Sequence, residues 1–155
     1  MSETVMSLEE TARFLERDFP QMNAGGRHYH LEAVGSLSAR MRLDYHERHL
    51  RPGGTVSGPS MMALADYALY AAILANIGPV ALAVTTSLNV NFLRRPGPAA
   101  LIAECRLLKL GRRLAVGEVT IRSAGSEAIV CHATGTYSIP PERGDASAPA
   151  TRPEP

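Results

Sequence analysis

The sequence predicts an α+β domain in which a curved antiparallel sheet wraps one long, buried helix. Three observations indicate this fold. Residues 58–77 have the length of a helix and are apolar on every side, as is typical of a helix enclosed by other structure. Four segments with the alternation of strands follow it, and one or two precede it. Short turns join the later segments, so neighbouring strands are expected to run antiparallel.

The bulk composition is that of an ordinary single domain, with 155 residues, a net charge of +1 and 20% charged residues. No aromatic ladder accompanies Arg40 and Arg42, which argues against nucleic-acid binding. The acidic N-terminus and the interrupted apolar run over residues 67–84 argue against a signal peptide or a membrane span. We therefore expect a cytoplasmic protein. Cys105 and Cys131 lack metal-site spacing, and we expect neither a metal nor another cofactor.

The elements before the long helix are a helix and a strand region. An amphipathic helix is predicted over residues 7–19, with a capping box formed by Ser7 and Glu10. Residues 29–45 then alternate between apolar and polar side chains, as a half-buried strand does. A shorter strand can precede Gly35 within this region. We therefore expect one helix and one or two strands here.

The long helix has clear start and stop signals. A loop rich in Gly and Pro, residues 46–59, leads into it. Ser57 or Gly58 can cap the helix, and Pro59 suits its first turn. Gly78 ends it, so that at 1.5 Å per residue the helix spans roughly 28 Å. Its many alanines allow the surrounding sheet to approach closely.

Four strand candidates follow, over residues 80–93, 100–110, 113–122 and 127–139. In the first of them, strict alternation places Leu88 and Val90 on one face and Thr85 on the opposite face. An open sheet leaves its edge strands unpaired. Pairing of two protomers edge to edge is therefore expected.

The chain divides into three parts. Residues 1–26 hold the N-terminal helix and its lead-in, residues 27–139 hold the main domain, and residues 140–155 are polar and rich in proline. A segment with the composition of the third part cannot bury enough apolar surface to order itself, so we expect a flexible tail.

Asp66 is the only charged residue of the predicted helix, and no lysine or arginine between Gly53 and Asn91 could pair with it. An unpaired carboxylate in an apolar environment is strongly disfavoured. Tyr70, four residues on, could donate a hydrogen bond, which would make Asp66 a satisfied structural acid. Alternatively, Asp66 belongs to a site, where such groups are more often retained. The helix N-terminus near Gly58 could then polarise a carbonyl while Asp66 activates water.

The segment HLRPGGTVSGPSMMALAD, residues 49–66, resembles the hotdog-fold thioesterases of the phenylacetate-degradation type. In that family an Asn-Pro-x-Gly-x-x-His-Gly-Gly loop leads into the helix, and an Asp follows the His by nine positions. Asp66 has the same offset from Ser57. Two later segments, AVTTSLNVNFLRRP and LLKLGRRLAVGEVTI, also resemble the family. The resemblance covers residues 29–139 and implies the hotdog fold, in which the sheet wraps the central helix.

The resemblance also implies a reaction, the hydrolysis of an acyl-CoA thioester to the free acid and CoA. Asp66 would be the general base or nucleophile, and the N–H of Gly58 would polarise the thioester carbonyl. Thr85 best matches a hydroxyl that the partner subunit contributes in the family. Sites between subunits imply a homodimer at least, and the family often forms a dimer of dimers.

Three positions depart from the family pattern: Arg51 replaces its Asn, Ser57 its His and Pro59 its second Gly. Pro59 has no N–H to donate, and loss of one oxyanion donor lowers kcat by about two to three orders of magnitude. Ser57 could have no role beyond capping the helix. Arg51 either supplies positive charge near the substrate or is an exposed loop residue. The alternative function is a non-catalytic protein that binds an acyl group or acyl-CoA. A hydratase is disfavoured because the helix has no His.

Cations at turns are candidates for binding the phosphates of CoA. They are Arg94, Arg95, Lys109, Arg112 and Arg113, at turns that antiparallel topology could place near one another. Turn arginines are also commonly just solvated. Arg51, Ser57 and Tyr70 complete the candidate substrate-binding residues.

Overall fold

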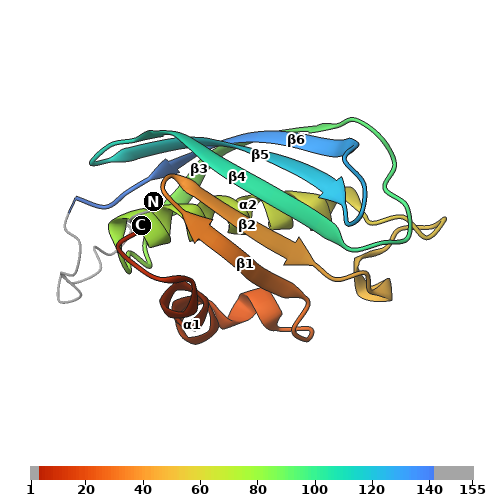
Figure 1. Cartoon of the computed structure of the whole chain (residues 1–155), viewed down its shortest axis with the longest axis horizontal. Coiled ribbons are helices and arrows are strands. Elements are labelled where there is room, and N and C mark those ends of the chain that lie inside the picture. The colour runs from red at the N-terminus through yellow and green to blue at the C-terminus, as the bar shows by residue number, and fades with distance from the viewer. Residues whose placement is uncertain (1–3, 142–155) are drawn as a thin grey trace, which may run out of the picture.

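The computed structural model describes residues 4–141, which form two α-helices, two short 3-10 helices and one six-stranded sheet (Figure 1). In chain order the elements are α1 (Leu8–Asp18), η1 (Pro20–Asn23), β1 (Tyr29–Gly35), β2 (Ser38–Leu43), η2 (Glu47–His49), α2 (Gly58–Ile77), β3 (Val84–Phe92), β4 (Leu101–Leu110), β5 (Leu114–Ser123) and β6 (Ile129–Ser138). The predicted fold class is confirmed: an antiparallel sheet curves around α2 (Figure 1). Of the predicted tail, residues 142–155 lie outside the described residues.

The strand order in the sheet is β1-β2-β4-β5-β6-β3, and every neighbouring pair is antiparallel. The strand that follows α2 therefore crosses to the far side of the sheet and pairs with the last strand. This order leaves β1 and β3 as the two edges of the described sheet. An edge strand presents unpaired N–H and C=O groups, which makes it a natural place for a second chain to pair.

The N-terminal helix α1 forms as predicted. The hydroxyl of Ser7 accepts from the N–H of Glu10 at 3.1 Å, and the Glu10 carboxylate accepts from the N–H of Ser7 at 3.0 Å. This capping box satisfies two of the N–H groups that have no partner in the first turn of a helix. The helix packs beside β1 and α2 (Figure 1).

The region predicted to hold one or two strands, residues 29–45, forms two, β1 and β2, which are separated by a turn at Leu37. This residue has a φ of 56°, which is unusual for a side chain of its kind. The Asn76 side chain accepts from the N–H of Leu37 at 3.0 Å and so supports the turn. Of the apolar residues in this alternating region, Leu37 is exposed, whereas Met41 and Leu43 are buried.

The long helix α2 begins and ends close to its predicted limits. Ser57 is its N-cap, and Gly78, with a φ of 104°, donates to the Leu74 carbonyl at 2.8 Å and closes it. Buried residues lie on every side of the helix. By length and composition α2 could also cross a membrane, but 67% of its most apolar window is buried within this fold. It is therefore accounted for as the core helix of the domain.

Two facing glycines set how closely α2 approaches the sheet. Gly117 on β5 and Gly135 on β6 are register partners, and both lie against Leu69 of α2. A Cβ added at Gly117 would lie 2.6 Å from Leu69 Cδ2, and one added at Gly135 would lie 2.5 Å from Cδ1. Real Cβ atoms do not approach neighbours so closely. The absence of side chains at these two positions therefore lets the helix pack deeply into the sheet.

Strand β3 contains a β-bulge that the alternation did not reveal. The strand starts at Val84 rather than at residue 80, and its pairing with β6 passes from Thr85 opposite Tyr137 to Ser87 opposite Thr136. Thr86 is the extra residue. A bulge changes which face the neighbouring side chains point to. Thr85 consequently faces the helix, as Leu88 and Val90 do, and the prediction that it lies on the face opposite to theirs was wrong.

Candidate active site

The carboxylate of Asp66 is held by two hydroxyl groups. It lies half-buried in the middle of α2, and its Oδ1 accepts from Thr85 Oγ1 at 2.7 Å and from Tyr137 Oη at 2.7 Å. The Tyr137 hydroxyl also lies 3.0 Å from the backbone carbonyl oxygen of Asp66. Within residues 4–141, Oδ2 of Asp66 receives no hydrogen bond and no cation pairs with the group. One carboxylate oxygen is therefore fixed, and the other remains available.

The hydrogen bond that Tyr70 could donate to Asp66 does not form. The Tyr70 hydroxyl donates to the carbonyl oxygen of Ala81 at 3.0 Å, and its ring stacks on that of Tyr137 with centroids 6.2 Å apart. The side chain is buried in the core rather than placed in a binding groove. Tyr137 takes the expected role instead. No sequence signal indicated it, because it lies 71 residues from Asp66 and meets it only through the fold.

The structure brings Thr85 to Asp66 within the same chain. The resemblance implied that this hydroxyl comes from the partner subunit, whereas Thr85 bonds the Asp66 of its own protomer. The bulge in β3 explains this contact, because it turns Thr85 toward α2.

The Tyr137 hydroxyl stays protonated and donates to Asp66. Its side chain is only 3% exposed, and burial together with the nearby Asp66 carboxylate raises the pKa of Tyr137 far above its ordinary value. The same two causes raise the pKa of Tyr67, the next residue of α2. Tyr137 therefore keeps its proton throughout the physiological pH range and can only donate to the carboxylate.

The first turn of α2 has one N–H group to offer. The Ser57 hydroxyl accepts from the Ser60 N–H at 3.3 Å, and the Ser57 carbonyl accepts from the Met61 N–H at 3.2 Å. Pro59 has no N–H. Among the described residues, the N–H of Gly58 has no partner. Ser57 is thus the cap of the helix, and Gly58 is the remaining donor at its positive end.

A groove of about 540 Å³ opens at this helix start. Phe92, the last residue of β3, covers Gly58, since a Cβ added there would lie 3.2 Å from the end of the Phe92 ring. The groove is lined by Arg51, Thr55, Val56, Gly58, Pro59, Met61, Phe92, Leu93, Arg94, Arg95 and Pro96. It therefore combines an apolar floor, a free N–H and three arginines. Arg51, Arg94 and Arg95 meet here.

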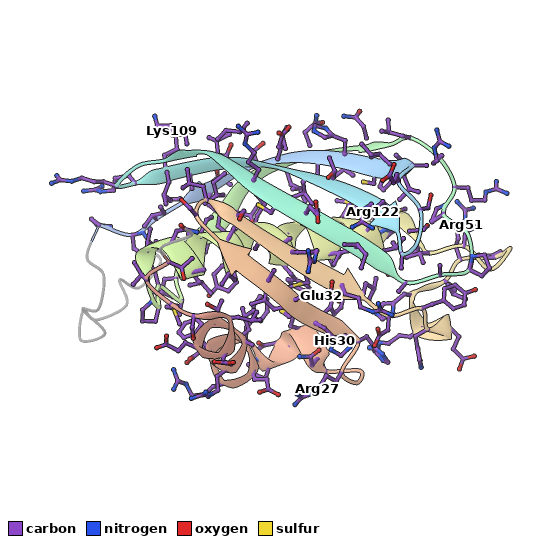
Figure 2. The ribbon with its side chains drawn as sticks, viewed as in Figure 1. Arg27, His30, Glu32, Arg51, Lys109 and Arg122 are labelled. Atoms are coloured by element: carbon purple, nitrogen blue, oxygen red, sulfur yellow. The ribbon has the colours of Figure 1, made fainter. Side chains whose placement is uncertain are left out.

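The other predicted cations do not join this groove. Phe92 pairs with Cys131 at one end of β6, whereas Leu114, next to the turn that carries Arg112 and Arg113, pairs with Ser138 at the other end. Figure 2 shows the same separation, with Arg51 and Lys109 at opposite ends of the molecule. Within a single chain, the topology therefore does not place all of these turns near one another.

Comparison with known proteins identifies the family. The model of the thioesterase superfamily matches residues 53–130, which include Gly58, Asp66 and Thr85. A candidate esterase of Pseudomonas aeruginosa is 30% identical over 139 residues, covering 88% of this chain and 100% of that protein. The chain belongs to the thioesterase superfamily.

Solved structures agree with membership of this superfamily. A candidate thioesterase from a Silicibacter species is 48% identical with a TM-score of 0.82, covering 90% of this chain and 96% of that one. A mutant of the phenylacetic acid degradation protein PaaI from Thermus thermophilus is 25% identical with a TM-score of 0.64, covering 82% and 98%. These likenesses agree with the predicted hotdog thioesterase of the phenylacetate-degradation type. They support hydrolysis of thioester bonds as the class of reaction.

In this thioesterase-superfamily protein, the two candidate catalytic groups of one chain lie far apart. Gly58 and Asp66 are eight residues apart on α2, which is about 12 Å along the axis of a helix. A reacting carbonyl must lie about 3 Å from its oxyanion donor and close to the activated water. Asp66 also does not line the groove at Gly58. One chain alone therefore does not bring both groups to one thioester.

Three histidines pack together at the start of the loop that carries Arg51. The ring of His28 lies 4.3 Å from that of His46 and 5.3 Å from that of His49, between centroids. His49 is only 8% exposed, and its Nδ1 has no partner among the described residues. Its carbonyl accepts from the N–H of Ser57 at 2.8 Å, which ties it to the cap of α2. Burial lowers the pKa of His49, and so does the positive charge of His28, His46 and Arg48.

The lowered pKa of His49 predicts a loss of stability in acid. Because the unfolded chain, with an ordinary pKa of 6.5 for this group, takes up the proton first, the free energy of unfolding should fall as the pH drops below that value. The His49→Phe variant removes the titrating ring and its unpartnered nitrogen. We expect urea unfolding between about pH 7.5 and about pH 5.5 to show a smaller fall for this variant than for wild type. An equal fall in the free energy of unfolding for the two proteins would contradict a lowered pKa of His49.

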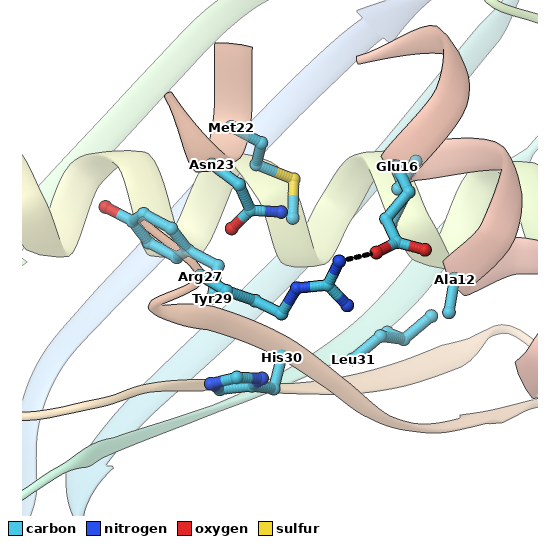
Figure 3. Close-up of a pocket in the computed structure, with 9 residues that line it drawn as sticks. Ala12, Glu16, Met22, Asn23, Arg27, Tyr29, His30 and Leu31 are labelled. Atoms are coloured by element: carbon cyan, nitrogen blue, oxygen red, sulfur yellow. Dashed lines mark ion pairs between the residues drawn. The ribbon is translucent and has the colours of Figure 1, made fainter. Parts of the chain in front are cut away.

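The described part of the protein also contains a second cavity, two cysteines and side chains of the types that bind metals. A smaller cavity of about 160 Å³ lies between α1, η1 and β1, where Arg27 and Glu16 form an ion pair (Figure 3). It holds none of the predicted site residues. Burial raises the pKa of Cys105 to about 12 and that of Cys131 to about 11, so neither is a ready thiolate nucleophile. Within residues 4–141, no three His, Cys, Asp or Glu side chains are arranged to hold a metal ion.

Proposed function

We propose that this protein hydrolyses acyl-CoA thioesters, with Asp66 activating water and the N–H of Gly58 polarising the thioester carbonyl. One observation supports the proposal above all: a half-buried carboxylate is kept on the core helix without a cation, held at Oδ1 while Oδ2 stays available. A group arranged in this way suits proton transfer from water.

The reaction follows from these two groups. Water attacks the carbonyl carbon of the thioester, and Oδ2 of Asp66 takes a proton from the water as the C–O bond forms. The negative charge that develops on the carbonyl oxygen is stabilised by the N–H of Gly58 and the positive end of α2. The C–S bond then breaks, the electron pair leaves with the CoA sulfur, and the proton returns to that thiolate. The products are the free acid and CoA.

Two protomers are required for this site in our proposal. Within residues 4–141, β3 pairs only with β6 and leaves its other side open. Antiparallel pairing of two β3 strands about their centre would place the Phe92 end of one beside the Thr85 end of the other. Phe92 lies against Gly58, and Thr85 is bonded to Asp66. The groove of one protomer would thus meet the carboxylate of its partner.

The groove suits the remaining parts of an acyl-CoA molecule. Arg51, Arg94 and Arg95 line it, and guanidinium groups bind phosphates through paired hydrogen bonds. Met61 and Phe92 provide apolar surface beside them. We assign the phosphates of CoA to these arginines and the uncharged arm of CoA to the apolar floor. Arg112 and Arg113, at the far end of the sheet, have no role in this proposal.

A non-catalytic acyl-CoA-binding protein is the second candidate function. The observation that favours it is the reduced set of donors at the helix start, where Pro59 lacks an N–H and Ser57 is occupied as the cap. Such a protein would use the groove and its arginines to bind acyl-CoA without hydrolysing it.

The release of free thiol from a panel of acyl-CoA esters distinguishes these two functions. Wild-type protein should hydrolyse at least one short, long or aromatic acyl-CoA at a rate far above the uncatalysed one. The same acyl group on a thiol without phosphates should give a higher KM, because it cannot contact the arginines. Binding of acyl-CoA by calorimetry with no hydrolysis across the panel would favour the binding protein and contradict our proposal.

A further inference from the structure

Three elements of the fold converge on one oxygen atom. Asp66 comes from α2, Thr85 from β3 and Tyr137 from β6, and both hydroxyls lie 2.7 Å from Oδ1. The same Tyr137 hydroxyl lies 3.0 Å from the backbone carbonyl oxygen of Asp66. The last strand of the sheet thus reaches both the side chain and the backbone of this helical residue.

The two donors form a cross-strand pair. Thr85 and Tyr137 are register partners in the β3 and β6 ladder, and they stand immediately before the bulge at Thr86. Bulges commonly re-aim a side chain near a functional site. Without the extra residue, alternation would direct Thr85 away from α2. The bulge therefore has a specific result, which is to aim two neighbouring hydroxyls at one carboxylate oxygen.

We propose that Tyr137 is a positioning residue that, with Thr85, holds Oδ1 of Asp66 so that Oδ2 is the oxygen that takes the proton from water. This inference rests on the proposed function and extends it to a residue outside the motif around the helix. Tyr137 acts through Asp66 and does not itself contact the reacting atoms.

The contacts of Tyr137 make it the stronger of the two holders. Tyr137 is almost fully buried, and its ring stacks on Tyr70. Thr85 is half-buried on an edge strand and can adjust with that strand. Hydrogen bonds from O–H groups favour the ionised form of a carboxylate. Tyr137 therefore sets the orientation of Asp66.

The test is the pH profile of hydrolysis by Tyr137→Phe. The acid limb of kcat/KM reports ionisation of the essential base in the free enzyme. Removing a donor that favours the ionised carboxylate should move this limb to higher pH. We also expect kcat to fall by about 10- to 100-fold with little change in KM. The substrate is the acyl-CoA that the wild-type protein hydrolyses best.

Tyr70→Phe is the matched control. It removes a tyrosine hydroxyl from the same ring stack and loses one hydrogen bond, to Ala81 rather than to Asp66. Its acid limb should stay at the wild-type position. Thr85→Val provides a second test on β3, and Thr85→Ser should restore the profile because it keeps the hydroxyl.

The outcomes separate this inference from the proposed function. If Asp66→Asn abolishes hydrolysis while Tyr137→Phe keeps both kcat and the wild-type acid limb, the role of Tyr137 is overturned and the proposed function stands. A Tyr137→Phe profile that shifts no more than that of Tyr70→Phe overturns it as well. If Asp66→Asn remains active, the proposed function itself fails. A shifted acid limb specific to Tyr137→Phe and Thr85→Val supports the inference.

Discussion

The Asp66→Asn variant is expected to lose thioester hydrolysis, with kcat lowered by about two to four orders of magnitude and KM little changed. Asparagine has nearly the same shape and keeps an oxygen that can accept from Thr85 and Tyr137, the two donors seen in the structure. Its amide cannot take a proton from water. The measurement is thiol release from the best acyl-CoA ester of the wild-type protein.

Asp18→Asn supplies the control for this prediction. Asp18 ends α1 and forms an ion pair with Arg17 at the surface, and exposed pairs of this kind contribute little to stability. The variant carries the same chemical change and should hydrolyse the substrate at the wild-type rate. Undiminished activity in Asp66→Asn, with the fold intact by circular dichroism, would rule out Asp66 as the base.

Mixing two inactive variants tests whether each site is shared between protomers. The exchange Gly58→Pro with Pro59→Ala moves the proline from the second to the first position of α2 and so removes the free N–H. Ser57 before it has ψ of 154°, which suits a following proline. In mixed dimers with Asp66→Asn, one of the two sites would be wild type. After subunit exchange the mixture should therefore regain about a quarter of the wild-type activity.

Activity is recovered on mixing only if the Gly58 and the Asp66 of one site come from different protomers. If Gly58 and Asp66 acted within one chain, every site in the mixture would carry one defect and the mixture would stay inactive. Pro59→Ala alone keeps the Gly58 N–H and controls for the altered turn. Subunit exchange is checked with a tagged copy, so that a lack of recovery has a clear meaning.

Local patterns were sufficient to predict most of the secondary structure. The capping box at Ser7, the apolar helix and the strands β4 to β6 all depend on residues close together in sequence, and the structure confirms them. The division between β1 and β2 was less clear, because its turn uses Leu37 with a positive φ rather than a glycine. That conformation is supported by Asn76, which is 39 residues away. A distant partner of this kind leaves no local signal.

The candidate site shows the same contrast between local signals and contacts with distant residues. Asp66 was found because a lone charge in an apolar helix is an anomaly that the sequence shows directly. Tyr137 was missed because only the pairing of β3 with β6 and the approach of α2 bring it there. Thr85 was assigned to the wrong face because a bulge inverts the alternation after one extra residue. Sequence patterns thus indicated the candidate base but not the contacts that orient it.

Leu69→Ala is expected to destabilise the domain by about 2–5 kcal/mol, because it leaves a cavity where α2 meets the sheet. Leu69 is only 1% exposed and fills the space between Gly117 and Gly135. Gly135→Ala is expected to destabilise by about 1–3 kcal/mol for the opposite reason, since its methyl group would overpack the same space. Equilibrium unfolding in urea measures both free energies.

The double variant decides whether packing against Leu69 is the cause. With Leu69 shortened to alanine, the methyl group at Gly135 has room, so the two effects should fall short of their sum by about 0.5–3 kcal/mol. Gly97→Ala adds the same methyl group where nothing lies within 4 Å and should change stability little. Additive effects would show that Gly135 acts through its backbone instead.

Overpacking at Gly135 should also affect activity. Because Gly135 stands two residues before Tyr137 and Leu69 stands one turn after Asp66, it should separate the Tyr137 hydroxyl from the Asp66 carboxylate. Hydrolysis by Gly135→Ala should therefore fall at temperatures where the variant is still fully folded.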